Sequence, residues 1–584
     1  MPVVGTAGHV DHGKSTLIHQ ITGRNPDRWA EERARGLTID LGFAWATLPG
    51  GREVSFVDVP GHEKFLKNML AGIEAIDVAL FVVAADEGWM PQSEEHLAVL
   101  DLLEVRRGVV AVTKADVVAP DLLELAMAEV SDRLVGSTLE NNPVVAVSGV
   151  TGEGVPELLD YVEQLLPPDR EGGTRPRLWV DRSFSVAGAG TVVTGTLLNA
   201  GIAVDDQVEI YPGGATSRVR SIQSHEREHD WVGPGRRVAL NLGGIDSGDI
   251  ARGDMVGKPG QWETSRRFTV TLRQARFSTD LDRRGAYQLH IGSAAHRVEM
   301  TALDEDVAVL VTDSLIPMTV GDRFILRDTG RRLVVAGGRV LDPGPPRLER
   351  ALRQARSVDP SATSDQIAQA LLDNRRQERL DRLAAHSDGG VPGEAIKVGP
   401  IAFTQDRWND LTEAAIAFVD EEHRDHPLRP GLPIATLTAR LGVDGAVTER
   451  VVTESEMLVR TGPNVALASH RGGLTPEQAE AWDKTRQRLA RGLDIPTEGD
   501  LALDPDILAS KLRNGELVRV SPELVYLPEQ IDEIKEIIRR LDQGFTVAGF
   551  RDAAGLSRKY AVPILEWTDR EGLTVRRGDL RSLR

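Results

Sequence analysis

The sequence predicts a multidomain protein with an α/β domain first, two β-barrel domains next, and a helical C-terminal third. Three observations lead to this prediction. A phosphate-loop signature lies near the start of the chain, between a strand-like and a helix-like run. Short alternating strands, punctuated by Gly and Pro, extend from Arg177 to about Val340. A helical unit of about 60 residues that ends in a hairpin then repeats to the C-terminus.

Length and composition are those of ordinary globular domains. A chain of 584 residues is too long for one core, so three or more domains are expected. The longest apolar runs, such as Val78 to Ala85, are too short to span a bilayer. The chain has no cysteine, which excludes disulfides and thiolate metal sites and fits a reducing cytosol. We therefore expect a cytoplasmic monomer without a membrane partner.

The charge is distributed unevenly. The net charge of −19 argues against wholesale wrapping of nucleic acid. Between Gly544 and Arg584, however, eight Lys and Arg side chains face five carboxylates, so this segment is +3 and the rest of the chain is −22. A small basic patch on an acidic protein suits one local RNA or DNA contact, and a solvated surface is the alternative interpretation.

Residues Gly8 to Ser15 read GHVDHGKS, a complete G-x-x-x-x-G-K-S motif. The strand-like run Pro2 to Ala7 precedes it and the helical pattern Ser15 to Ile21 follows it. Its glycines let backbone N–H groups turn toward phosphate oxygens beside a helix N-terminus. Lys14 would neutralise the outer phosphates, and the Ser15 hydroxyl would bind Mg²⁺. The phosphate-binding residues predicted from this motif are Asp11, His12, Gly13, Lys14, Ser15 and Thr16.

Two further motifs predict the parts around the metal and the terminal phosphate. DVPGH, from Asp58 to His62, follows the strand Val54 to Val57, so the Asp58 carboxylate can reach Mg²⁺ through a water. Gly61 can turn its N–H toward a γ-phosphate, and loss of that bond on hydrolysis would release the next segment. Upstream, RGLTID places Thr38 where its hydroxyl and carbonyl could cap the metal.

The motif TKAD, from Thr113 to Asp116, predicts which base is bound. A carboxylate placed like Asp116 accepts two hydrogen bonds from a guanine edge that adenine cannot offer, so GTP is selected over ATP. Lys114 would lie over the base. Ser148 and Gly149 follow the last strand, where backbone N–H groups could contact the guanine carbonyl. Strands and helices alternate from Val3 to Leu166, which predicts a doubly wound parallel sheet with the nucleotide at the strands' C-terminal ends.

Together, GHVDHGKS, RGLTID, DVPGH and TKAD resemble the translational GTPases of the elongation factor Tu kind. The resemblance implies a P-loop GTPase domain that uses GTP, GDP and Mg²⁺. It also implies that His62 positions or polarises the attacking water, with Val10 and Leu37 as an apolar gate. Most such proteins have Asn at the position of Thr113. A threonine hydroxyl is shorter and lacks one donor, so we expect some loss of nucleotide affinity.

Within the first barrel, VDRSFSVAGAGTVVTGT (Val180 to Thr196) and GRRVALNL (Gly235 to Leu242) resemble selenocysteine-specific elongation factors. In that family the aminoacyl pocket is cationic, because a selenol is ionised at neutral pH whereas the hydroxyl of serine is not. The resemblance assigns Arg182 and Arg237 to this pocket, with Arg236 as the competing alignment for the second position. Arginines that are simply exposed on barrel strands are the alternative.

The C-terminal third contains four similar hairpins, whose turn positions Gly399, Gly462, Ser521 and Gly578 are 63, 59 and 57 residues apart. Helices followed by a two-stranded hairpin predict four tandem winged-helix domains. The predicted boundaries are 1–172 for the GTPase domain, 173–262 and 263–345 for the two barrels, and 346–403, 404–470, 471–528 and 529–584 for the winged helices.

The last unit carries the basic patch. Thr546 to Ala554 is predicted as a first helix, and Ser557 as the cap of a second helix that runs to about Glu571. Pro563 removes an interior hydrogen bond, so we expect a kink or a later helix start. Tyr560, Ile564 and Leu565 would face the core. The residues predicted to bind RNA are Arg551, Ser557, Arg558, Lys559 and Tyr560 on the helices and Arg576 and Arg577 on the wing.

Taken together, these resemblances imply membership of the selenocysteine-specific translation elongation factors. The helix-turn-helix alone favours DNA, whereas the translational context favours an RNA hairpin with splayed bases. The resemblance implies GTP-dependent delivery of selenocysteyl-tRNA to the ribosome at recoded UGA codons, with the chain tethered to an mRNA hairpin. Alternatives are a general tRNA carrier, the GTPase subunit of a sulfate-activating enzyme, and a GTP-gated transcription regulator that reads DNA.

Overall fold

The computed structural model describes residues 1–24, 41–60, 76–168, 173–188, 190–278, 281–345, 348–470, 472–541 and 544–584. Leu37, Thr38, Gly61 and His62 lie outside these ranges. The chain divides into two compact units, Met1–Thr404 and Gln405–Arg584. Across the described residues, no helix is both long enough and apolar enough to cross a membrane.

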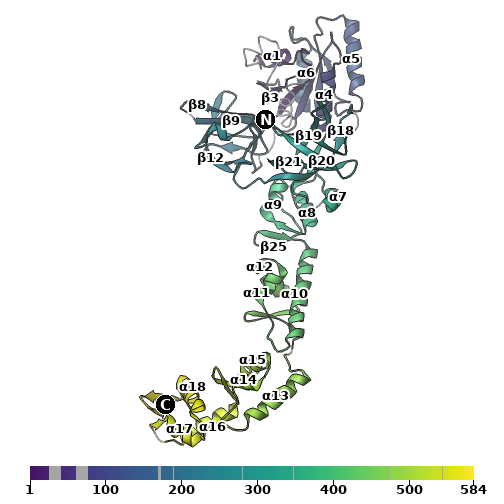
Figure 1. Ribbon diagram of the computed structural model, residues 1–584. Coiled ribbons are helices and arrows are strands. Elements are labelled where there is room, and N and C mark those ends of the chain that lie inside the picture. Colours follow the sequence, from purple (N-terminus) through teal and green to yellow (C-terminus); the bar gives the residue numbers. More distant parts are fainter. Residues whose placement is uncertain are drawn as a thin grey trace. The chain divides into compact units, whose positions relative to one another are not determined.

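The first domain, which lies in the purple and blue part of the chain in Figure 1, is built on a six-stranded sheet in the order β2-β3-β1-β4-β5-β6. Its strands are β1 (Val3–Ala7), β2 (Gly42–Thr47), β3 (Glu53–Asp58), β4 (Val78–Ala84), β5 (Gly108–Thr113) and β6 (Val144–Ala146). Its described helices are α1 (Lys14–Thr22), α4 (Pro91–Leu102), α5 (Pro120–Leu134) and α6 (Val155–Leu165). Every residue of β4 and β5 is buried, as expected for central parallel strands that helices cover on both faces.

One strand of this sheet departs from the predicted parallel arrangement. β2 pairs antiparallel with β3, whereas the other described pairings of the sheet are parallel. A short turn joins the two strands, in which Gly51 has a φ of +88° and its N–H donates to the carbonyl of Leu48. A connection this short can only produce antiparallel neighbours. The sheet is therefore mixed, with its one described antiparallel strand at the edge.

The next two domains are closed six-stranded barrels. The first ring runs β11-β16-β7-β9-β15-β12 and closes by pairing β11 with β12. Its ring strands are β7 (Arg177–Trp179), β9 (Gly190–Leu198), β11 (Gln207–Tyr211), β12 (Ala215–Ser224), β15 (Arg237–Gly243) and β16 (Met255–Gly257). Strands β8 (Arg182–Val186), β10 (Ile202–Ala203), β13 (Arg227–His229) and β14 (Trp231–Val232), with the 3₁₀ helix Ser247–Asp249, lie outside the ring.

The second barrel runs β17-β21-β20-β19-β22-β23 and closes by pairing β17 with β23. Its strands are β17 (Thr264–Thr271), β18 (Arg273–Gln274), β19 (Arg284–Ile291), β20 (Ala294–Ala302), β21 (Val307–Pro317), β22 (Arg323–Asp328) and β23 (Leu333–Asp342). Of these, β18 pairs only with β23. The two barrels predicted from the alternating strands are thus confirmed. Closure leaves no sheet edge unpaired in either ring.

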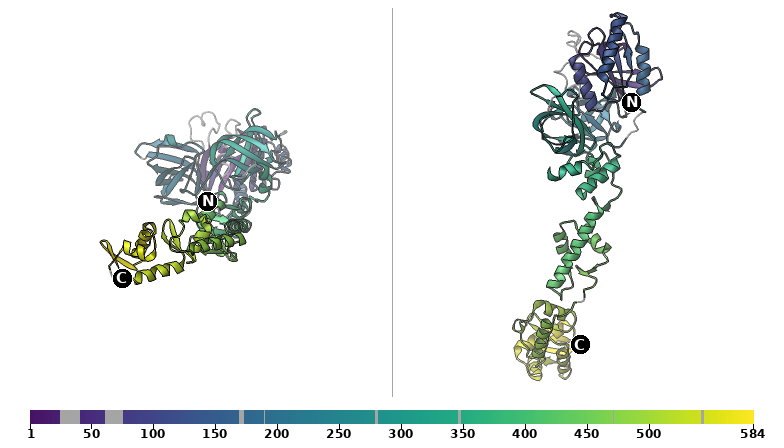
Figure 2. Two further views of the ribbon diagram at one scale, coloured as in Figure 1. Left: turned by 60° about the horizontal axis from the view of Figure 1, so that its bottom comes forward. Right: turned by 90° about the vertical axis from the view of Figure 1, so that its right-hand side faces the viewer.

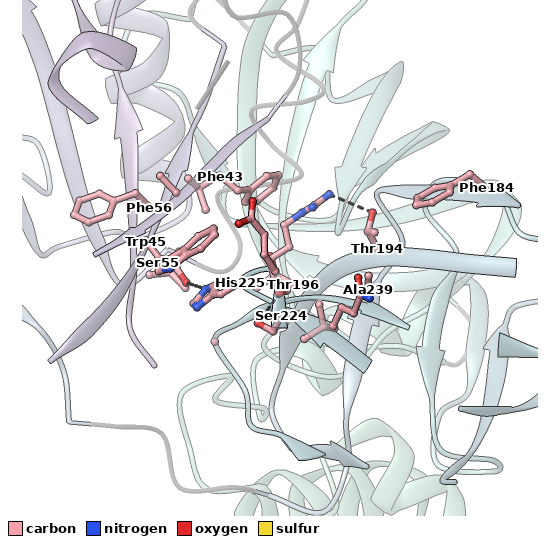
Figure 3. A pocket seen from close by; sticks show the side chains of 18 residues that line it. Phe43, Trp45, Ser55, Phe56, Phe184, Thr194, Thr196, Ser224, His225 and Ala239 are labelled. Atoms are coloured by element: carbon pink, nitrogen blue, oxygen red, sulfur yellow. Dashed lines mark hydrogen bonds between the residues drawn. The ribbon is translucent and has the colours of Figure 1, made fainter. Parts of the chain in front are cut away.

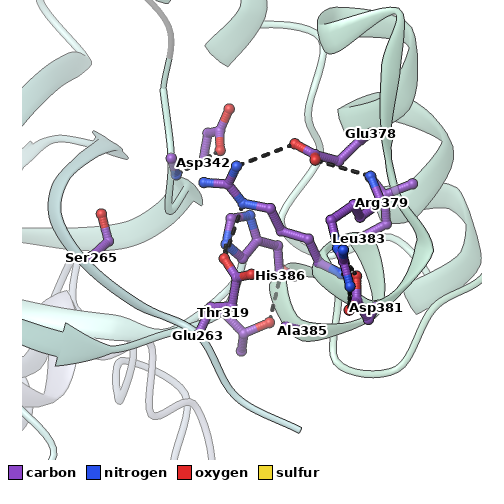
Figure 4. Close-up of polar contacts among 12 residues, drawn as sticks. Glu263, Ser265, Thr319, Asp342, Glu378, Arg379, Asp381, Leu383, Ala385 and His386 are labelled. Carbon is purple, nitrogen blue, oxygen red and sulfur yellow. Dashed lines mark hydrogen bonds and ion pairs between the residues drawn. The ribbon is translucent and has the colours of Figure 1, made fainter. Parts of the chain in front are cut away.

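The segment after the second barrel is held to it by buried polar contacts (Figure 4). It contains α7 (Leu348–Ala355), α8 (Ser364–Arg375), β24 (Gln377–Arg379), α9 (Leu380–His386), β25 (Ile396–Val398) and β26 (Ile401–Phe403). The guanidinium of Arg375 lies 2.6 Å from Asp342 and 3.2 Å from Glu378. His386 is buried, and its Nε2 is 3.2 Å from Glu263. These contacts explain why the first compact unit extends to Thr404.

In the second unit, the order of helices followed by a hairpin recurs (Figure 2, green to yellow). Residues 405–470 contain α10 (Gln405–Asp425), β27 (Leu432–Pro433), α11 (Ile434–Leu441), α12 (Gly445–Glu454), β28 (Leu458–Thr461) and β29 (Asn464–Leu467). The next segment contains α13 (Pro476–Leu489), α14 (Glu498–Leu501), α15 (Pro505–Arg513), β30 (Val518–Ser521) and β31 (Leu524–Tyr526). The last contains α16 (Pro528–Arg539), β32 (Phe545–Thr546), α17 (Val547–Ala554), α18 (Arg558–Arg570), β33 (Thr574–Arg577) and β34 (Leu580–Leu583).

The last helix corrects one expectation. Helix α18 begins at Arg558 and continues through Pro563, so the prediction of a later helix start is wrong. Pro563 lacks only one N–H donor, and Ile564 and Leu565 beside it are fully buried in a hydrophobic cluster. The packing of these side chains outweighs the missing hydrogen bond. The cluster also contains Tyr526 and Trp482, so the last two helix-and-hairpin segments share one core.

Candidate functional site

The phosphate loop joins β1 to α1 with the backbone that the motif requires. Gly8 has a φ of +133°, and a Cβ atom there would lie 2.1 Å from the carbonyl oxygen of Val82. Lys14 is buried, and its Nζ donates to the carbonyls of Gly8 at 3.1 Å and His9 at 2.6 Å. Burial lowers the pKa of Lys14 to about 8, against the opposing influence of Asp58 and Asp11. A phosphate chain in this loop would therefore lie beside an ammonium group that is buried and held by backbone carbonyls.

The predicted metal-binding residues meet at the ends of β3 and α1. The Ser15 hydroxyl donates to Asp58 Oδ2 at 2.6 Å, and the Thr6 hydroxyl donates to Asp58 Oδ1 at 2.8 Å. Asp58 itself is fully buried. A hydroxyl and a carboxylate held together beside a phosphate loop are hard oxygen donors, and this donor set fits Mg²⁺. The predicted roles of Thr38, Gly61 and His62 cannot be placed, because these residues lie outside the described ranges.

The base-recognition motif lies at the end of β5, against the phosphate loop. The Thr113 hydroxyl donates to the carbonyl of His12 at 2.7 Å, so the shorter side chain still ties the two segments together. Lys114 has a φ of +57°, and its Nζ lies 3.0 Å from Asp86 and 2.8 Å from Glu87. Asp116 is exposed in the following turn.

The loop after β6 approaches the same site. The Ser148 hydroxyl accepts hydrogen bonds from the N–H groups of Val150 at 3.3 Å and Thr151 at 3.0 Å, which fixes the loop. Gly149 lies against α1, because a Cβ atom there would be 3.3 Å from Thr16 Cγ2. Three predicted segments surround the base and phosphates, namely 11–16, 113–116 and 148–149. They therefore converge where the C-terminal ends of β1, β5 and β6 meet.

Two side chains of α4 that the sequence motifs did not reveal also hold the phosphate loop. The Gly8 N–H donates to His96 Nδ1 at 2.8 Å, and the Val10 N–H donates to Gln92 Oε1 at 3.0 Å. His96 is buried, and its burial lowers its pKa to about 3, so the ring is neutral and Nδ1 can accept. No local motif marks these residues, because the contact depends on how a crossover helix packs beside the loop.

A cavity of about 240 Å³ lies between the first domain and the first barrel (Figure 3). Strands β2 and β3 contribute Phe43, Trp45, Ser55 and Phe56 to its lining, and barrel residues such as Phe184, Thr194, Thr196 and Ala239 face them. His225 from the barrel stacks on Trp45 with 4.6 Å between ring centroids and an interplanar angle of 5°. The cavity is thus mainly apolar with a few polar groups, as is common for ligand sites.

Arg237 is the cation at this cavity. Its guanidinium lies 4.0 Å above the centre of the Phe43 ring, and its Nη2 donates to the Thr194 hydroxyl at 3.1 Å. Asp181 accepts from the same guanidinium through both carboxylate oxygens, each 3.0 Å from Nη2. The Arg237 and Asp181 side chains are 16% and 11% exposed, so the pair is largely shielded from water.

The other arginines predicted for this region lie elsewhere. Arg182 is half-buried on β8 opposite Thr194 of β9 and does not line the cavity. Arg236 points to the first domain, where its Nη2 is 3.1 Å from Glu53. Asp181 was not among the predicted site residues, although a carboxylate directly before Arg182 was a visible signal. Its partner could not be deduced, because Arg237 is 56 residues away.

At the C-terminus, three of the predicted RNA-binding residues line a hollow of about 290 Å³. Arg551, Arg558 and Arg576 line it, together with Thr546, Val547, Ala548, Asp579 and Arg581. Arg558, Lys559, Arg576 and Arg577 are exposed, and Tyr560 packs partly against the core. Ser557 occupies the N-cap position of α18, although its side chain makes no capping hydrogen bond.

Arg551 pairs with Asp552 and Arg581 pairs with Asp569, whereas Arg558 and Lys559 differ from the cations of residues 405–470. There Arg440, Arg450 and Arg460 form ion pairs with Glu421, Glu454 and Glu449. Within the described part of the chain, neither Arg558 nor Lys559 has a carboxylate within ion-pairing distance. Unpaired cations beside a hollow are available to phosphates.

Comparison with known proteins identifies the families of three of these domains. A family model of the elongation factor Tu GTP binding domain matches residues 1–168, so the nucleotide is a guanine nucleotide. The beta-barrel domain of selenocysteine-specific elongation factors matches residues 265–347, and the winged helix of elongation factor SelB matches residues 536–583.

Full-length relatives and structures give the same result. Selenocysteine-specific elongation factors from Desulfomicrobium baculatum and Escherichia coli K12 are each 34% identical to the chain. Both matches cover the whole of this chain. They cover 100% of the Desulfomicrobium baculatum protein and 98% of the Escherichia coli protein. The crystal structure of a bacterial selenocysteine-specific elongation factor superposes with a TM-score of 0.73 at 27% identity and covers both chains completely. The chain therefore belongs to the selenocysteine-specific elongation factors, a family of translational GTPases.

Proposed function

We propose that the chain carries selenocysteyl-tRNA to the ribosome in a GTP-dependent cycle and acts at recoded UGA codons. The single observation that supports this most strongly is the cavity that contains Arg237. It joins the GTPase domain to the first barrel, so an aminoacyl group bound there would contact the domain that binds the nucleotide. Family membership indicates the class of reaction, and the residues of the cavity indicate how the aminoacyl group is recognised.

In this proposal, Arg237 recognises the selenolate. The Phe43 ring and Asp181 hold its guanidinium in place, so little side-chain entropy is lost when an anion binds. An ionised selenol gains a charge-assisted hydrogen bond here, whereas the neutral hydroxyl of serine gains a weaker one. Arg182, which lies next to Asp181 in the chain, is proposed to reach the same group from β8 when the aminoacyl-tRNA is bound.

In the nucleotide site, Lys14 and the N–H groups of residues 11–16 would hold the phosphates, and Asp116 would select guanine. Ser15 and Asp58 would hold Mg²⁺, which would supply charge neutralisation at the phosphates. Among the described residues, no cluster of three or more His, Asp or Glu side chains offers a separate metal site, which agrees with a metal shared with the nucleotide. We propose that His62 orients the water that attacks the γ-phosphate, with Thr38 and Gly61 completing the site.

The C-terminal segment is proposed to bind an mRNA hairpin. Arg551, Arg558 and Arg576 share one hollow, and Lys559 and Arg577 lie on the same helix and wing. We infer that the three preceding helix-and-hairpin segments are also winged helices, because each ends in an antiparallel hairpin after three helices. The paired arginines of residues 405–470 favour a spacer role for that segment. The chain would act as a monomer in the cytoplasm, where ribosomes are found.

The test compares selenocysteyl-tRNA and seryl-tRNA on the same tRNA body. In the GTP-loaded state, the chain should protect the selenocysteyl ester from hydrolysis at concentrations at least about tenfold lower, since a hydrogen bond to a charged group contributes about 1.5–3 kcal/mol. Equal protection of both esters would contradict the assignment of Arg237. Filter binding to duplex DNA and to an RNA hairpin separates the translational role from a DNA-reading regulator, because preference for the duplex excludes the former.

A further inference from the structure

A second arginine-lined hollow lies in the first compact unit, away from the nucleotide and aminoacyl sites. It has a volume of about 570 Å³ and opens where the GTPase domain meets the second barrel. Its lining comes from the end of α4, the loop after α5, and strand β18 with the residues that follow it. The cationic residues of this lining are Arg106, Arg273 and Arg276.

Two of these arginines are fixed in place across the seam between the two domains. Arg273 Nη2 donates to the carbonyl of Asp101 at 2.6 Å, and Arg276 Nη2 donates to the carbonyl of Val135 at 2.6 Å. A guanidinium group has five N–H donors, so each retains donors that these bonds do not use. Both side chains are therefore preorganised cations with remaining hydrogen-bonding capacity.

The one carboxylate in the lining is already engaged. Asp101 Oδ1 accepts from the backbone N–H of Thr138 at 2.6 Å and from the Thr138 hydroxyl at 2.9 Å, and Asp101 is 3% exposed. Its Oδ2 lies 3.7 Å from Arg276. Arg106 is exposed and has no ion pair with any residue that the structure describes. Three guanidinium groups thus face this hollow against one largely buried carboxylate.

We propose that this hollow binds a compact polyphosphate group at the seam between the GTPase domain and the second barrel. Planar guanidinium groups match phosphate oxygens in shape and charge. The volume lies within the range of about 300–1,000 Å³ that is usual for small-ligand sites, so the phosphate chain of a nucleotide fits. A ligand here would contact both domains at once. The phosphates could belong to a free polyphosphate or to RNA, and the chemistry of recognition is the same.

The experiment titrates inorganic tripolyphosphate into the full-length chain by calorimetry, with the nucleotide site saturated by GDP. The decisive variant is Arg106→Gln, because Arg106 makes no ion pair with the described residues and its loss should leave the melting temperature unchanged. We expect tripolyphosphate affinity to fall about tenfold or more, the effect of removing one charged hydrogen-bond donor. Arg273→Gln should have a similar effect on affinity, with an added loss of stability at the seam.

Two control variants distinguish tripolyphosphate binding in this hollow from binding elsewhere on the chain. Arg284→Gln removes an exposed arginine on β19 of the same barrel and should leave the affinity within about twofold, the scale of a distant surface charge. Arg558→Gln reports any binding at the arginine-lined hollow near the C-terminus. The proposal is overturned if the GDP-saturated chain does not bind tripolyphosphate at millimolar concentration, or if Arg106→Gln binds it as well as the unaltered chain.

A competition arm identifies the source of the phosphate. If a short single-stranded RNA displaces tripolyphosphate, the hollow accepts phosphates of an RNA backbone. If RNA does not displace it, the ligand is a free polyphosphate. Either result supports the site, and neither depends on the delivery of selenocysteyl-tRNA.

Discussion

Asp181 holds the guanidinium of Arg237 through both of its oxygens, each 3.0 Å from Nη2, while the same guanidinium lies over the ring of Phe43. The pair is formed between β15 and the residue before β8, and it is largely shielded from water. A cation held this firmly can be both a structural and a recognition element. The structural role is measured by the free energy of unfolding, and the recognition role is measured by the protection of selenocysteyl-tRNA relative to seryl-tRNA.

Replacing Arg237 should therefore affect both stability and selectivity. Arg237→Ala leaves the Asp181 carboxylate largely buried without its partner, and such a change costs about 3–5 kcal/mol when burial is complete. Chemical denaturation monitored by tryptophan fluorescence should show a loss toward the lower end of this range. Arg236→Ala is the matched control, since Arg236 pairs with an exposed Glu53 and its loss should cost less than about 1 kcal/mol. Equal losses in the two variants would contradict this account of the pair.

His96 should control how long the nucleotide stays bound. His96→Ala removes the acceptor of the Gly8 N–H and leaves a buried donor unsatisfied, at a cost of about 1–3 kcal/mol. Dissociation of a fluorescent GDP analogue, followed by stopped flow, should therefore accelerate by about tenfold. His96→Asn places an amide oxygen near the position of Nδ1 and should restore much of the lifetime. An unchanged rate in His96→Ala would show that the loop does not depend on α4.

The buried histidines predict a loss of stability in mild acid. Burial lowers the pKa of His12 to about 4 and the pKa values of His96 and His290 to about 3. In the unfolded chain these groups titrate near pH 6.5, so below that pH the unfolded state binds more protons than the folded state. The contribution of these histidines to the free energy of unfolding should have its full value above about pH 6.5. The free energy of unfolding should fall as the pH decreases toward about 4.

This pH dependence can be measured by urea unfolding at a series of pH values. Each of the three histidines should contribute up to about 1.4 kcal/mol per pH unit in that window. His290→Leu removes one proton-binding group, whose Nε2 has no hydrogen-bond partner among the described residues, and should flatten the profile accordingly. A variant profile parallel to that of the unaltered chain would exclude His290 as a source of the slope.

Arg558 should contribute to RNA binding without affecting the nucleotide site. Arg558→Ala removes an exposed cation at the N-terminal end of α18, so affinity for the RNA hairpin should fall about tenfold and the salt dependence should weaken by about one unit of slope. Filter binding at several salt concentrations gives both quantities. Arg440→Ala, which removes a cation already paired with Glu421, should bind the hairpin normally. Reduced GTP binding in Arg558→Ala would argue against a local role.

The sequence predicted those parts of the site that lie in contiguous motifs. Lys14, Ser15 and Asp58 meet because a phosphate loop and a strand end have few possible geometries. Asp181 and His96 were missed, since their roles depend on the register of a barrel strand and on the packing of a crossover helix. The antiparallel edge strand β2 was also missed, although Pro49-Gly50-Gly51 is a clear turn signal, because the alternation of strands and helices along the domain favours a parallel sheet. The later helix start predicted from Pro563 is wrong, because the packing of the neighbouring side chains outweighs the low helix propensity of proline.

The shared core of the last two helix-and-hairpin segments limits how the RNA-binding end can be dissected. Tyr526, Ile534 and Trp567 belong to one cluster that spans both segments. A fragment that starts at residue 529 would leave part of this cluster facing water, and exposed apolar surface of that kind promotes aggregation. A recombinant fragment intended for hairpin studies should instead begin before α13, near residue 472, so that the buried residues of the shared cluster are kept, with the exception of Leu428.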